Sequence, residues 1–294
     1  MGRRNARMSK LRPLARFAAA LALVSLAPAH ALSAQDVKGT SERELLAAFR
    51  QSFDSKDEAS RARAVNTLGN SSRQLADMGV GKRIAQALVR GLEDRDLDVA
   101  AAAVSQLCYG RDVDTVIVAL DAFLRAQYRE IEKRAESTDD ASREFVGRAT
   151  VLFGNACYAF MNYKDERTAA TLVALLENLP ADTKKSDAGS RLVGALAAAT
   201  LEQGTEPAVA TAVEKTKTFS GAAQTAGGQA LHAALTEFAT KHEWTPPDWN
   251  ETYSQAWFSW LEANRNKLPK KLGRLAAPPM NEPSHAQNGM PGKS

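Results

Sequence analysis

Apolar residues recur at intervals of three and four along the chain from about residue 41 onward, and the polar gaps between them are short. This spacing predicts amphipathic α-helices, because residues three and four apart share one helix face. Three such stripes are Leu45, Leu46, Phe49 and Phe53; Ile84, Leu88 and Leu92; and Val113, Val116, Ile117, Leu120 and Leu124. No convincing strand pattern is found, so the sequence predicts an all-α protein.

Start and stop signals fall between the stripes. Ser41 and Glu44 form a capping-box pattern, in which each side chain satisfies a backbone N–H at a helix start. Asp112, Asp139 or Asp140, and Asp165 can each cap a following helix. Gly79, Gly81, Pro180, Gly204 and Pro207 are the predicted breakers. Composition agrees, because alanine is abundant and aromatic residues make up only 6% of the chain.

A weak repeat relates these helices in pairs. Small residues superpose at Ala64, Ala103, Ala149, Gly194 and Ala230, about 36 to 46 residues apart. In this register Asp57, Asp96 and Asp187 coincide in the turn between the two helices of a unit, where a carboxylate caps the second helix. Leu68, Leu107 and Phe153 coincide on the second helix. Small residues at one register predict that successive second helices approach closely.

The segments Leu92–Ala103 and Asp57–Gly69 carry a pattern that resembles the HEAT repeat of the armadillo-type α-solenoids. Arg61 and Arg191 occupy the register at which that family has arginine, whereas Ala100 and Val146 depart from it. The resemblance covers about residues 41–242 and implies a right-handed α-α superhelix of about five helix pairs within a domain of residues 35–242. It also implies a concave surface of second helices that holds a protein or peptide.

All four tryptophans lie in a C-terminal segment, residues 243–275. Tyr253, Trp257 and Trp260 share one helix face. Stacked repeats need terminal caps, so one interpretation is a helix that covers the last repeat. The other is an exposed aromatic platform that binds a sugar or a peptide. Residues 276–294 are rich in proline and polar residues and are expected to be a disordered tail.

Residues 1–34 have the layout of a secretory signal peptide. Six basic residues precede an apolar stretch from Phe17 to Leu26, and small residues follow it. The stretch is about ten residues, roughly half of the ~20 that span a bilayer. Cleavage after Ala31 or Ala34 fits, and we favour Ala34. These features predict a periplasmic or secreted protein with no integral membrane segment after signal removal.

Removal of the signal peptide changes the charge. The chain has 38 basic and 34 acidic residues, and residues 1–34 contain six of the basic residues and none of the acidic ones. The mature chain therefore has 32 basic against 34 acidic residues, a net charge of about −2. Because no basic surface remains to neutralise phosphates, the sequence argues against a nucleic-acid partner.

Few residues suggest chemistry. Cys108 and Cys157 fall on second helices of neighbouring repeats, where two buried thiols are favoured over a disulfide. The carboxylates of Asp94, Asp96 and Asp98 alternate as in a calcium loop, but the required glycine and the distant glutamate are absent, which favours helix capping. The histidines share no metal-ligand spacing. We therefore expect no catalytic residues, metal or cofactor.

Together these observations predict an exported scaffold that binds an unidentified protein or peptide without covalent chemistry. A first alternative is an envelope or extracellular structural protein whose Trp-rich helix contacts glycan. A second alternative is enzymatic, since some HEAT-like proteins resemble lyases that attach bilin pigments; an export signal fits their substrates poorly.

Overall fold

The computed structural model describes residues 41–75, 81–135, 137–179, 187–219, 226–250 and 252–272. They form the helices α1 (Glu42–Phe53), α2 (Glu58–Leu75), α3 (Lys82–Leu92), α4 (Leu97–Leu107), α5 (Val113–Ala135), α6 (Asp140–Met161), α7 (Glu166–Glu177), α8 (Asp187–Glu202), α9 (Glu206–Phe219), α10 (Ala226–Lys241) and α11 (Tyr253–Asn264), then a 3₁₀ turn at Arg265–Lys267. The described residues contain no strand, so the all-α prediction is confirmed. The predicted signal peptide (1–34), its cleavage at Ala34 and the tail (276–294) lie outside the described residues.

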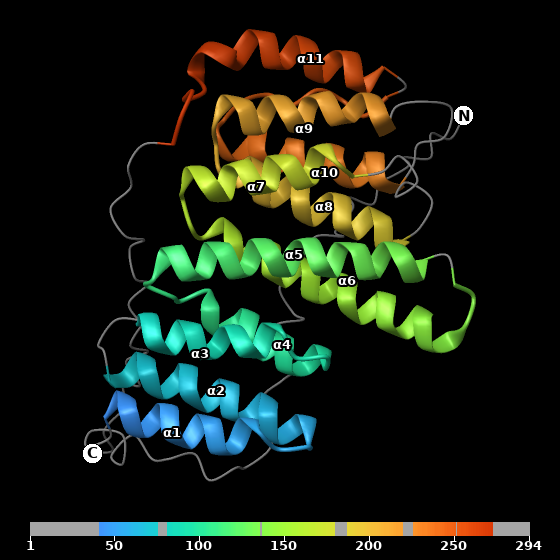
Figure 1. Ribbon diagram of the computed structural model, residues 1–294. Helices are drawn as coiled ribbons and strands as arrows, with labels where there is room; N and C mark the ends of the chain where they lie inside the picture. Colours follow the sequence, from blue (N-terminus) through green and yellow to red (C-terminus); the bar gives the residue numbers. More distant parts are fainter. Residues whose placement is uncertain are drawn as a thin grey trace, which may run out of the picture.

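The helices stack in chain order from α1 to α11 (Figure 1). Each even-numbered helix packs against the next even-numbered helix, so that α2, α4, α6, α8 and α10 form one continuous layer. The odd-numbered helices α1, α3, α5, α7, α9 and α11 contact one another in the same sequence and form a second layer. The core lies between the two layers, and every helix from α1 to α10 contributes buried apolar side chains to it.

The helices begin where the local signals place them. The Ser41 backbone N–H donates to Glu44 Oε2 at 2.6 Å, and the Glu44 N–H donates back to Ser41 Oγ at 3.3 Å, so the capping box is present. The carboxylates of Asp96, Asp139 and Asp165 accept backbone N–H groups at the starts of α4, α6 and α7. These bonds satisfy donors that have no partner within the helix.

Two predicted breakers behave differently. Gly204 lies between α8 and α9 and has a φ of +68°, which favours glycine. Pro207, by contrast, lies inside α9, directly after its first residue. The prediction that Pro207 separates two helices is therefore wrong. A proline is tolerated in the first turn of a helix because the N–H that it lacks would have no intrahelical partner there.

The apolar stripes form the core. The buried residues of α1 are Leu45, Leu46, Phe49 and Phe53, the same four that the spacing selects. In α5 the buried residues also include Phe123, and the stripe continues beyond Leu124 to Ile131, because that helix is 23 residues long. The partner helix α6 has 22 residues, and the α5–α6 hairpin extends past the ends of the neighbouring helices (Figure 1).

Small residues bring neighbouring helices together. A Cβ at Gly194 would lie 3.5 Å from Ala230 Cβ, so two of the superposed small-residue positions face each other between α8 and α10. At Gly91 a Cβ would lie 2.8 Å from Ala103 Cβ and 3.2 Å from Val65, which is too close for any side chain. Three helices therefore meet at Gly91.

We expect Gly91→Val to lower the free energy of unfolding by about 1–3 kcal/mol, because the branched side chain must push α3 away from α2 and α4. Gly147 is the matched control, since it is an exposed helical glycine with nothing within 4 Å of a Cβ. Gly147→Ala should raise stability by about 0.5–1 kcal/mol. Urea denaturation followed by circular dichroism measures both changes. A Gly91→Val protein as stable as the wild type would contradict the close packing.

Arg61 ties the first helix pair to the second. Its guanidinium donates to both carboxylate oxygens of Asp94, with Nε–Oδ2 2.7 Å and Nη2–Oδ1 3.0 Å. It also donates through Nη1 to the backbone carbonyls of Ser55 and Lys56. Both side chains of the pair are about nine-tenths buried. A bidentate pair of this kind fixes the relative orientation of the two turns that it joins.

Candidate interaction surface and cap

The carboxyl-terminal ends of the even helices lie along one edge of their layer. Tyr163, just after α6, donates its hydroxyl hydrogen bond to the carbonyls of Leu107 and Gly110 at the end of α4. Lys164 donates to the carbonyl of Glu202 at the end of α8, and Lys241 at the end of α10 donates to the carboxylate of Glu202 at 2.7 Å. The bonds from Tyr163 and Lys164 satisfy backbone carbonyls at helix ends, and the bond from Lys241 pairs the ammonium with a carboxylate.

Exposed apolar side chains gather on this layer. Large hydrophobic residues that are well exposed in the described part of the chain are Tyr109 (53%), Val118 (66%), Val151 (50%) and Tyr158 (49%). Val151 and Tyr158 lie on one face of α6, two turns or about 10 Å apart. Only Val118, on α5, belongs to the other layer. Single exposed apolar residues are ordinary, so the grouping is what distinguishes this surface.

Tyr109 and Tyr158 lie at neighbouring helix ends. Tyr163, five residues after Tyr158, hydrogen-bonds to Leu107, two residues before Tyr109. The guanidinium of Arg73, at the end of α2, lies 4.3 Å from the centre of the Tyr109 ring. Partial burial and the carboxylate of Glu237 on α10 both raise the pKa of Tyr158, so its hydroxyl remains protonated at neutral pH. We call this region the even-layer surface. It consists of Tyr109, Val151 and Tyr158, with Arg73 and Glu237 beside them.

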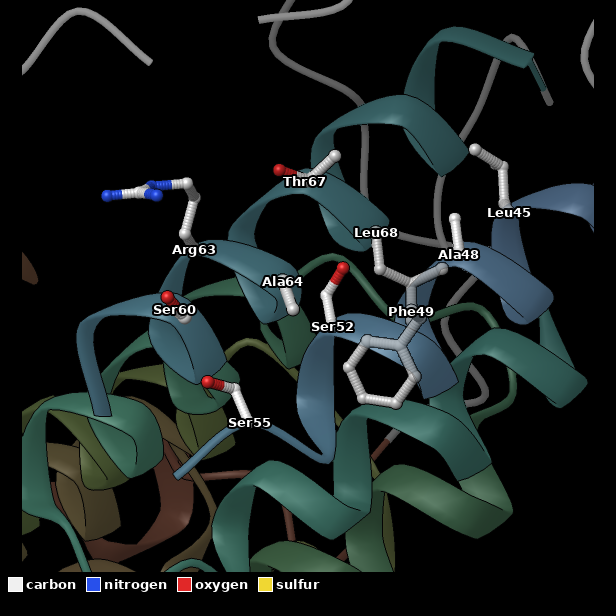
Figure 2. Close-up of a pocket in the computed structure, with 10 residues that line it drawn as sticks. All are labelled: Leu45, Ala48, Phe49, Ser52, Ser55, Ser60, Arg63, Ala64, Thr67 and Leu68. Carbon is white, nitrogen blue, oxygen red and sulfur yellow. The ribbon is translucent and has the colours of Figure 1, made fainter. Parts of the chain in front are cut away.

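A groove of about 350 Å³ opens between α1 and α2 (Figure 2). Its apolar lining comes from Leu45, Ala48 and Phe49 of α1 and from Ala64 and Leu68 of α2, and its polar lining consists of Ser52, Ser55, Ser60, Arg63 and Thr67. Figure 2 shows the Arg63 side chain extending away from the other lining residues. No cluster of titratable groups lines this groove, so it offers shape and apolar contact and no evident reactive group.

The Trp-rich helix covers the last helix pair. In α11 the buried residues are Tyr253, Trp257, Trp260, Leu261 and Asn264, and Trp257 is completely buried. The Tyr253 hydroxyl donates to the Thr216 carbonyl of α9 at 3.3 Å. Tyr253, Trp257 and Trp260 therefore face the protein interior and offer no free ring face to a ligand in this conformation. Trp244 and Trp249, before α11, are only half buried.

His232 of α10 contacts the aromatic residues of the cap. Its ring centre lies 4.9 Å from that of Trp249, 6.1 Å from Tyr253 and 5.7 Å from Trp257. The indole N–H of Trp257 donates to His232 Nδ1 at 3.0 Å. Burial lowers the pKa of His232, and the carboxylate of Asp248 opposes that shift in part. Sequence reasoning missed this residue, because a single histidine on a helix carries no signal of its aromatic partners.

Both cysteines are free thiols. Cys157 is completely buried, and burial raises its pKa. Cys108 is half buried, and burial raises its pKa to about 11. A thiol with a raised pKa is a poor nucleophile at neutral pH, because the thiolate is the reactive form. The structure brings no disulfide partner to either residue.

The alternating carboxylates of Asp94, Asp96 and Asp98, in the turn between α3 and α4, each have a separate structural partner. Asp94 pairs with Arg61, Asp96 accepts the backbone N–H of Asp98, and Asp98 forms an ion pair with Arg148 at 2.8 Å. They do not converge on one point. Within the described residues no group of three or more histidine, cysteine, aspartate or glutamate side chains could hold a metal ion. None of the helices described is long and apolar enough to cross a bilayer.

Neither a comparison with models of known protein families nor one with curated proteins finds a match for this chain. The sequence predicts that a layer of second helices forms the binding surface, but it does not identify Tyr109, Val151 and Tyr158 as exposed residues of that layer. A weak signal exists for Val151 and Tyr158, since they lie seven residues apart, opposite the stripe that contains Phe153.

Proposed function

We propose that this protein is an exported scaffold of the HEAT-like, armadillo-type solenoid class, which binds a protein or peptide on its even-layer surface. The alternating contacts of odd and even helices support the solenoid assignment. The observation that carries the functional proposal is the concentration of exposed large apolar side chains on the layer of second helices. Exposed apolar groups on a regular helical layer favour association, since contact removes their surface from water.

Binding rather than catalysis is the function that these residues favour. The raised pKa values of Cys108 and Cys157 suit packing and not nucleophilic attack. We infer that the protein acts in the periplasm or the medium, because residues 1–34 have the layout of a secretory signal peptide. Tyrosine is well suited to such a surface, because it combines a large apolar ring with a polar hydroxyl.

Site-specific photo-crosslinking tests the proposal. A photoreactive phenylalanine analogue in place of Tyr158 should crosslink the mature chain, from about Gln35, to a defined partner in the envelope or secreted fraction of its host. The same analogue in place of Val118, on the odd layer, is the matched control and should give no such product. Crosslinking at 118 alone would place the interface on the odd layer and overturn the proposal, as would a product containing glycan and no protein.

The double variant Tyr109→Ser, Tyr158→Ser should weaken binding of the captured partner at least about tenfold, because two aromatic side chains would no longer leave water on association. Its melting temperature should match that of the wild type, since both side chains are about half exposed. Calorimetric titration measures the affinity. Val118→Ser is the control, and it should bind the partner as the wild type does.

A further inference from the structure

The contact between His232 and Trp257 depends on a protonation state. His232 Nδ1 accepts the indole N–H, and the Thr236 hydroxyl lies 3.4 Å from Nε2. A ring nitrogen accepts a hydrogen bond only when it carries no proton, so this geometry requires a neutral imidazole. In the imidazolium both nitrogens carry hydrogen, and Nδ1–H would then point at the indole N–H.

The groups around the imidazole favour its neutral form. The residues that surround it are Trp249, Tyr253 and Trp257, none of which is charged at neutral pH. Burial raises the pKa of Tyr253 to about 12, so its phenol remains neutral. The Asp248 carboxylate, on the segment before α11, is the acidic group that favours the charged imidazolium. It is exposed, and its effect is therefore screened by water.

Besides the buried side chains of α11, the cap has polar attachments to the helices beneath it. Thr216 of α9 contacts both Tyr253 and Ser254, with hydroxyl oxygens of Thr216 and Ser254 2.7 Å apart. Arg265 forms an ion pair with Glu206 at 2.6 Å, and the Glu206 N–H donates to the Pro269 carbonyl at 2.8 Å. The indole N–H of Trp260 is buried without a hydrogen-bond partner. An unsatisfied buried donor raises the free energy of the docked cap.

We propose that residues 244–250 and α11 form an acid-releasable cap, with His232 as its latch: protonation of the imidazole removes the Trp257 hydrogen bond and detaches α11 from α9 and α10. The folded state binds fewer protons at His232 than the unfolded or detached state does. The contribution of neutral His232 to docking is therefore fully present above the ordinary imidazole pKa of 6.5 and is lost as the pH falls below it. This inference rests on the cap geometry and does not depend on the proposed function.

Tryptophan fluorescence is a specific readout, because Trp244, Trp249, Trp257 and Trp260 are the tryptophans of the whole chain. We expect the emission maximum of the full mature chain to shift to longer wavelength between about pH 7 and about pH 5, with a parallel rise in acrylamide quenching. The helical signal in far-UV circular dichroism should fall by no more than the contribution of α11. Limited proteolysis at the lower pH should cut within residues 244–264 first.

The variant His232→Gln distinguishes protonation of His232 from the effects of acid on other groups. The glutamine amide oxygen can accept the indole N–H and does not titrate, so this variant should keep its emission maximum and its protease resistance over the same pH range. His242→Gln is the matched control. His242 is exposed and stacks on Trp244 with ring centres 5.0 Å apart, and its loss should leave the acid transition in place.

Two results would overturn the proposal: an acid transition of unchanged midpoint in His232→Gln, or a wild-type cap that stays protease-resistant at about pH 5. If His232→Gln does not fold at neutral pH, an NMR titration of the His232 imidazole in the wild-type protein tests the proposal instead. A His232 pKa at or above the ordinary 6.5 would contradict the latch, because protonation would then not oppose docking.

Discussion

Trp257→Ala is expected to lower the free energy of unfolding of the capped end of the molecule by about 3–5 kcal/mol. The indole is completely buried and is the largest of the fully buried side chains. Its removal takes a large apolar surface out of contact with Trp260, whose ring centre lies 5.1 Å away, and leaves a cavity between α11 and α10. It also leaves His232 Nδ1 without its donor.

Urea denaturation at neutral pH, monitored by circular dichroism, gives the size of this effect. Because the helices contact mainly their neighbours in the stack, the variant should unfold in two steps, with the C-terminal end first. Ser259→Ala is the control, because Ser259 lies on the exposed face of the same helix and its change should be within about 0.5 kcal/mol. A Trp257→Ala protein that unfolds as the wild type does would show that α11 does not stabilise the last helix pair.

Phe153→Ala should destabilise the middle of the stack by a similar amount, about 3–5 kcal/mol. Phe153 is completely buried on α6, and its ring centre lies 6.4 Å from that of Tyr128 on α5. Because α6 packs against α4, α5 and α8, a cavity there weakens contacts on both sides of the stack. We therefore expect a single cooperative transition at lower urea concentration, without the early C-terminal step.

Val151→Ala provides the comparison for Phe153→Ala. Val151 lies two residues earlier on the same helix but is 50% exposed, so its truncation should change stability by no more than about 0.5 kcal/mol. The same variant should weaken partner binding if the even-layer surface is the interface. Equal losses of stability in Phe153→Ala and Val151→Ala would contradict the assignment of inner and outer faces on α6.

Much of the fold is present in the local pattern. The four apolar residues of α1 and the caps Ser41, Asp96, Asp139 and Asp165 are all recognisable without coordinates. Helix formation and capping depend on residues within about four positions of one another, which is why a single sequence reveals them. Pro207 is the exception, since proline is compatible with both a turn and the first turn of a helix.

The candidate sites depend on contacts between distant residues. Arg61 and Asp94 are 33 positions apart, His232 and Trp257 are 25 apart, and Tyr163 and Leu107 are 56 apart. No periodicity specifies such pairs. The burial of Tyr253, Trp257 and Trp260 also depends on distant residues. An apolar helix face is compatible with both a cap and a ligand platform, and only a neighbouring helix that covers it distinguishes the two.

The sequence by itself determined that this chain is helical, where most helices start and which face of each helix is apolar, since these properties follow from side-chain chemistry at short spacing. The tertiary structure alone decided which apolar faces are covered, which leaves Tyr109, Val151 and Tyr158 in solvent and encloses Trp257. It also decided that a histidine on α10 accepts a hydrogen bond from α11. Tertiary packing determines the covered faces and this hydrogen bond, because the burial and the protonation state of a group depend on neighbours that are distant in the chain.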